Sequence, residues 1–177
     1  MADGKTRRDK LNAKYRDIRE DEGGKLVYTG DSFRMAGEAN PRRLTLIALL
    51  VLEFAVVVGS GCIDAAGATN AFYVILPYIG EVSALFALCW TSVKLLAGGD
   101  AVRKYVLDNA RTKIPGEARI LTVFALLGLL LSALYLMRNS TGGELFKSVL
   151  YLVLKAAAAV TAETYRRTFA DIRWDMN

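Results

Sequence analysis

The chain has 177 residues, of which 53% are hydrophobic and 23% are charged, and its formal net charge is +5. It contains no histidine and only two cysteines, which excludes histidine-based acid–base catalysis and disfavours zinc and haem sites. Charged residues are concentrated in 1–43, whereas most of 44–164 is apolar in long blocks. Because acids interrupt the basic residues of the N-terminal segment, the positive net charge does not predict a nucleic-acid partner.

The N-terminal segment, residues 1–43, carries two local signals. Leu11, Tyr15 and Ile18 recur at helical spacing, which predicts a short, highly charged helix over 5–22. The apolar residues 26–28 and Phe33 flank a turn-like Thr-Gly-Asp-Ser sequence and predict a small hairpin, the alternative being an extended linker. We expect the whole segment to be a mixed-charge cytoplasmic region.

Four apolar windows approach the roughly 20 residues that cross the hydrocarbon core of a bilayer. They cover 44–62, 71–97, 119–137 and 144–163. The fourth is the weakest because it contains Lys147, Lys155 and a run of alanines, and its alternative is an interfacial helix. The windows predict an all-α fold, a bundle of four transmembrane helices within 44–164 that is surrounded by the lipid bilayer and followed by a C-terminal tail at 165–177.

The connection at 98–118 has room for an element of its own. Asp100 is a suitable N-cap, and Val102, Tyr105 and Val106 share one helical face. The sequence Ile-Pro-Gly at 114–116 is a stop signal. We therefore expect a short amphipathic helix on the cytoplasmic membrane surface between the second and third spans, although a partner-docking helix would need the same features.

Lysine and arginine residues predict the orientation. Eleven lie in 1–43, five in 98–119 and three after Glu163, whereas the segment 63–70 has none and the turn at 138–147 has two. Because cytoplasmic segments are enriched in these residues, both termini are expected inside. The late start of the first apolar run excludes a cleaved signal peptide at the N-terminus. The short loops favour the cytoplasmic membrane of a bacterium.

Three ionisable residues fall deep within the windows: Glu53, Glu81 and Lys155. A charge near the midplane costs roughly 2.5–3.5 kcal/mol on insertion scales, so we expect Lys155 to pair with Glu53 or with Glu81. The remaining carboxyl would be protonated if it is desolvated. Pro77, one turn before Glu81, frees a backbone carbonyl and predicts a kink in the second helix. Hydroxyl partners are available on Tyr73, Tyr78 and Tyr151.

Two interpretations of this charge set remain open. In the first it is a structural ion pair, or a contact to another subunit, and the protein is an accessory, regulatory or assembly subunit of a membrane complex or a homo-oligomer. In the second it is a solute or proton site, and the protein is a small proton-coupled transporter. No phosphate-binding glycine loop and no catalytic motif is present, so we expect neither an enzyme nor a cofactor or metal.

Four short helices with an acid in the first span are similar to the pattern of the small multidrug exporters. Glu53 is the residue that carries this likeness. The long charged segment 1–43 and the long inner connection 98–118 depart from that compact pattern, so no family is assigned. The resemblance implies no site beyond Glu53.

Overall fold

The computed structural model describes residues 18–20, 26–28, 31–35, 39–99, 101–139 and 144–176. Four long helices dominate it, and each is long and apolar enough to cross a membrane. They are α2 (Ala39–Gly61), α3 (Phe72–Leu96), α4 (Lys104–Asn139) and α5 (Leu145–Ala170), and a short 3-10 helix η1 (Ala68–Asn70) precedes α3. The chain is therefore a helical membrane protein, as its apolar windows predicted.

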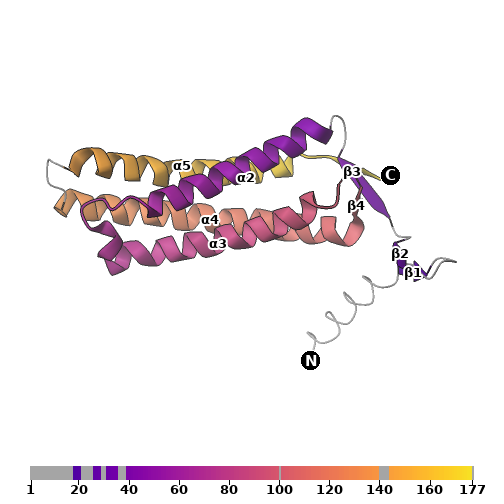
Figure 1. Ribbon diagram of the computed structural model, residues 1–177, viewed down its shortest axis with the longest axis horizontal. Coiled ribbons are helices and arrows are strands. Elements are labelled where there is room, and N and C mark those ends of the chain that lie inside the picture. The colour runs from indigo at the N-terminus through magenta and orange to yellow at the C-terminus, as the bar shows by residue number, and fades with distance from the viewer. Residues whose placement is uncertain are drawn as a thin grey trace, which may run out of the picture.

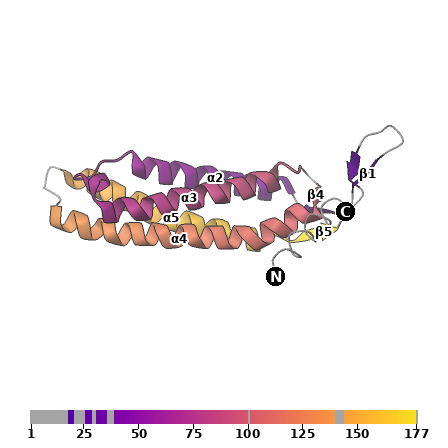
Figure 2. The ribbon, with the colours of Figure 1, turned by 90° about the horizontal axis from the view of Figure 1, so that it is seen from below.

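The four helices run side by side along one bundle axis (Figure 1). Helix α4 packs against both α3 and α5, and α2 packs mainly on α5 with a sparser contact to α3. Figure 2 shows that α4 and α5 extend beyond α2 at the end opposite the short strands. The bundle thus has one loosely packed seam, between α2 and α3.

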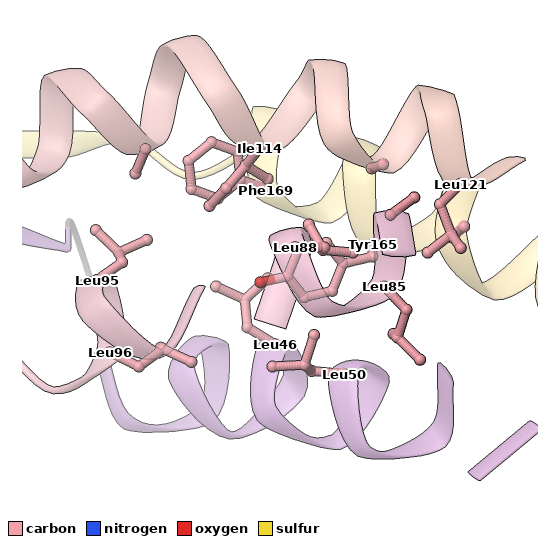
Figure 3. Packing of buried hydrophobic residues seen from close by; sticks show 14 of the residues in the cluster. Leu46, Leu50, Leu85, Leu88, Leu95, Leu96, Ile114, Leu121, Tyr165 and Phe169 are labelled. Carbon is pink, nitrogen blue, oxygen red and sulfur yellow. The ribbon is translucent and has the colours of Figure 1, made fainter. Parts of the chain in front are cut away.

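The core of the bundle consists of aliphatic and aromatic side chains from all four helices (Figure 3). On α2 and α3 the buried residues recur every three or four positions, as an inward stripe requires. Leu46 and Leu50 of α2 lie beside leucines of α3 such as Leu88. In a membrane such packing stabilises the fold through close van der Waals contact and not through the hydrophobic effect. The reason is that lipid tails are as apolar as the side chains that the bundle buries.

A three-stranded antiparallel sheet lies at one end of the bundle, called here the sheet end. Its central strand β3 (Ser32–Met35) pairs with β4 (Val102–Arg103) and with β5 (Trp174–Met176). The backbone N–H of Lys104 also donates to the carbonyl of Asp31 at 3.2 Å. The sheet therefore joins three distant segments, those before α2, between α3 and α4, and after α5.

The hairpin predicted within 25–35 is wrong in its pairing. Strand β2 (Leu26–Tyr28) forms where the first strand of the hairpin was expected, but it pairs with β1 (Ile18–Glu20). Phe33 belongs to β3, whose two neighbours come from far along the chain. The helix predicted over 5–22 is a strand at 18–20, and its other residues lie outside the described part of the chain. Packing of Met35 and Val102 into the core explains why β3 takes distant partners.

The stop expected at 114–116 is also wrong, because α4 continues from Lys104 through Pro115 to Asn139. Val102 lies in β4, before the helix begins, and Asp100 is not among the described residues. Ile114 and Ala118 are fully buried on either side of the proline. Their packing offsets the hydrogen bond that Pro115 removes, a loss that breaks many isolated helices. Similarly, α5 runs past Glu163 to Ala170, so the predicted tail begins inside a helix.

Candidate functional site

The central feature of the bundle interior is an ion pair between α3 and α5. The Lys155 ammonium contacts Oε2 of Glu81, and both side chains are shielded completely from the surface. Of the two partners that the sequence left open for Lys155, the structure selects Glu81. The carboxylate is placed by α3, which runs without interruption past the buried Pro77.

Aromatic rings and a glycine enclose the Lys155 ammonium. Its Nζ lies 4.4 Å from the ring centroid of Tyr78 and 5.8 Å from that of Tyr151, distances at which a cation is attracted to the ring face. A Cβ atom added to Gly128 of α4 would lie 3.9 Å from the same Nζ. Because residues of three helices surround it, the lysine is held in one position, and a counter-charge is necessary there.

Glu53 does not join this pair. It is fully buried on α2, and its Oε2 accepts a hydrogen bond from the hydroxyl of Thr161 on α5. Thr161 lies six residues beyond Lys155, which is about 9 Å along a helix. The three residues predicted at one depth therefore occupy two levels, with Glu53 nearer the sheet end.

Several buried carboxylate oxygens lack a hydrogen-bond partner among the described residues. They are Oε1 of Glu53, Oε1 of Glu81 and Oε2 of Glu117. An unpaired buried acceptor costs roughly 1–3 kcal/mol, more when it is charged, so such atoms are uncommon in packed interiors. Each of these glutamates uses its second oxygen for a bond to a hydroxyl or to the lysine.

A second polar layer, missed by the sequence analysis, lies nearer the sheet end. Thr91 of α3 donates to Oε1 of Glu117 at 3.0 Å, and the Tyr165 hydroxyl donates to Ser92 at 2.7 Å. Ser92 and Tyr165 are fully buried. Glu117 was assigned to a connection because of the preceding proline. Had α4 been extended through 115, helical spacing would have aligned Glu117 with the inward residues Ile114 and Leu121.

The tyrosines considered as partners of the acids have other contacts. The ring of Tyr73 lies against that of Tyr135, with centroids 6.0 Å apart. The hydroxyl of Tyr151 accepts a hydrogen bond from Ser132 at 3.4 Å. The ring face of Tyr78 lies against Lys155. The hydroxyl that binds Glu53 therefore comes from Thr161 and not from one of these tyrosines.

Within the described ranges, no group of three or more Cys, Asp or Glu side chains is arranged to hold a metal ion. The arrangement instead consists of one closed ion pair, one buried carboxyl that is hydrogen-bonded to a threonine, and one hydroxyl–carboxylate layer. No protein-family model matches the chain, and no curated protein and no solved structure matches it either.

Proposed function

We propose that this chain is a small non-enzymatic subunit of a bacterial cytoplasmic membrane, with both termini in the cytoplasm. It acts as an accessory, regulatory or assembly subunit beside another protein, or as a homo-oligomer. In this proposal the sheet end is cytoplasmic, because the segments richest in Lys and Arg meet there.

The observation that carries this proposal is an offset between the apolar zones of the helices. The Arg43 side chain donates a hydrogen bond to the backbone carbonyl of Leu96, the last residue of α3. The apolar part of α2, which begins at Leu44, therefore starts at the level where α3 ends. Glu117 lies beside Thr91, and α4 becomes apolar only after Arg119. The apolar zone of α2 therefore starts about 10 Å closer to the sheet end than that of α4, counted at 1.5 Å per residue.

Tilting the bundle accounts for only part of this offset. Neighbouring packed helices are 8–10 Å apart, and α2 and α4 lie diagonally across the bundle, roughly 11–14 Å apart, so a typical tilt of about 20° shifts one against the other by about 4–5 Å. Several angstroms of exposed apolar surface on α2 remain outside the lipid, around Leu44 and Ile47, which are 66% and 37% exposed. Another protein surface that covers them would remove this cost.

The enclosed ion pair supports the same conclusion. Lys155 is satisfied by Glu81 and by ring faces, and it fixes the positions of α3 and α5. A solute would have to displace these contacts in order to reach the lysine. The pair therefore suits a structural role better than a binding role.

Site-specific photo-cross-linking in native membranes tests the proposed interface. A photo-reactive residue at Ile47 on α2 is compared with one at Leu126 on α4, which is also exposed. We expect Ile47 to capture a second copy or one different protein in stoichiometric yield, identified by mass spectrometry after purification of the tagged chain. Capture of lipid alone at both positions would contradict the proposal.

Thiol labelling tests the orientation. Cys62 is exposed at the end of the bundle opposite the sheet, so a membrane-impermeant maleimide should label it in intact cells. In a Cys62→Ser background, a thiol introduced by Arg173→Cys should react only after the membrane is permeabilised. The reverse pattern would place the sheet end outside.

Proton-coupled solute transport is the second candidate function, and Glu53 favours it. This carboxyl is fully buried, has one unpaired oxygen and lies on α2, the helix that borders the loosely packed seam. Under this hypothesis Glu53→Gln gives a stable, inserted protein that no longer moves protons in liposomes containing a pH-sensitive dye. If Glu53 is only structural, the same change instead lowers thermal stability in detergent.

A further inference from the structure

Polar groups continue from Glu53 toward the sheet end along the facing sides of α3, α4 and α5. Thr161 and Tyr165 are one helical turn apart on α5, and Tyr165 reaches Ser92 across the bundle. Thr91, the residue that precedes Ser92 on α3, donates a hydrogen bond to Glu117. These groups form what is called here the polar file: Glu53, Thr161, Tyr165, Ser92, Thr91 and Glu117.

The polar file continues between its hydrogen bonds through closely spaced residues. On α5 the step from Thr161 to Tyr165 is one helical turn, and on α3 Ser92 and Thr91 are successive residues. The surrounding layer is filled by leucines such as Leu85 and Leu88.

Both ends of the polar file carry an unsatisfied acceptor. At the deep end it is Oε1 of Glu53, and at the other end it is Oε2 of Glu117. Glu53 is completely buried, whereas Glu117 is only partly buried and lies in the part of α4 whose surface is polar. Protonation removes the charge of such a carboxylate and turns one oxygen into a donor. The two ends are therefore suited to accept and release protons.

We propose that the polar file is a proton-transfer path between the aqueous phase at the sheet end and the carboxyl of Glu53, with Glu117 as its entry residue. A proton from water binds the carboxylate of the partly buried Glu117 and leaves a neutral carboxyl. Transfer continues in turn through the hydroxyls of Thr91, Ser92, Tyr165 and Thr161, each of which accepts one proton on its oxygen and releases its own. It ends as an O–H bond on Glu53, and the reverse sequence returns the proton to water. This path rests on the second candidate function, in which Glu53 exchanges protons.

The experiment follows protonation of Glu53 itself by infrared spectroscopy after a rapid pH jump on the full chain in liposomes. The signal is the carboxyl C=O band that Glu53→Gln removes. We expect Glu117→Gln and Tyr165→Phe each to slow the appearance of this band at least tenfold while leaving its final amplitude unchanged. Tyr165→Phe keeps the packed ring and removes only the hydroxyl.

Tyr151→Phe is the matched control, because this second buried tyrosine lies on the opposite side of the Lys155–Glu81 pair from the polar file. Its rate should equal that of the wild type. Equal rates in the wild type, Glu117→Gln and Tyr165→Phe would overturn the path, as would the absence of any titrating Glu53 band. A chain that shows the predicted rates but no solute-linked flux would refute the transport candidate alone.

Discussion

Among the described residues, Glu81 is the carboxylate that forms an ion pair with Lys155. Removing the lysine by Lys155→Met leaves the Glu81 carboxylate buried without a counter-charge, which typically costs about 3–5 kcal/mol. We expect a clear drop in the melting temperature of the purified protein in detergent.

The double variant Lys155→Met/Glu81→Gln separates charge pairing from packing. Because neither side chain is then charged, we expect it to recover most of the lost stability. A double variant as unstable as the single one would show that ring packing around the lysine, and not the ion pair, stabilises this point.

Alanine substitutions at Gly80 and at Gly128 should affect stability differently, although both glycines lie between packed helices. A Cβ at Gly80 would lie 2.6–2.8 Å from ring atoms of Phe124, whereas a Cβ at Gly128 would meet only ordinary contacts at 3.8–3.9 Å. Gly80→Ala should therefore destabilise the bundle by roughly 1–3 kcal/mol, the usual cost of overpacking, and Gly128→Ala should be tolerated. Adding Phe124→Leu to Gly80→Ala should restore thermal stability if the ring is the cause.

At the scale of elements, α4 shows what sequence patterns can and cannot predict. Four helices long and apolar enough to span a membrane followed from the apolar runs, because each span must satisfy its own backbone within lipid. The continuation of α4 through Pro115 did not follow, because it depends on Ile114 and Ala118 packing against other helices. The strands of the sheet were partly recognisable, but their pairing is a long-range property.

Gly116 tests whether α4 is continuous. It is exposed, has nothing within 4 Å of an added Cβ and does not have a positive φ. Gly116→Ala should therefore raise stability by about 0.5–1 kcal/mol, the difference in helix propensity. Gly99, with φ +71°, is the control at which alanine should destabilise. Destabilisation at both positions would place a break in the helix at 116.

At the scale of the whole molecule, the three-stranded sheet links the segment before α2 with the end of the described chain. Arg34 of β3 is opposite Asp175 of β5, so cysteines at 34 and 175 should form a disulfide in a background without Cys62 and Cys89. The pair 34 and 176 is shifted by one residue and should cross-link poorly, since successive side chains point to opposite faces. Gel mobility without reductant measures both yields, and equal yields would contradict the register.

The sequence by itself determined that this protein has four membrane-spanning helices and buried charges within them. Such properties are local, since each depends on composition along one stretch of chain. Only the tertiary structure decided that Lys155 pairs with Glu81, that Glu53 binds Thr161 at another level, and that Glu117 binds Thr91. Those outcomes depend on the relative rotation and axial shift of packed helices. A rotation of one residue position, 100° about a helix axis, would have selected different partners.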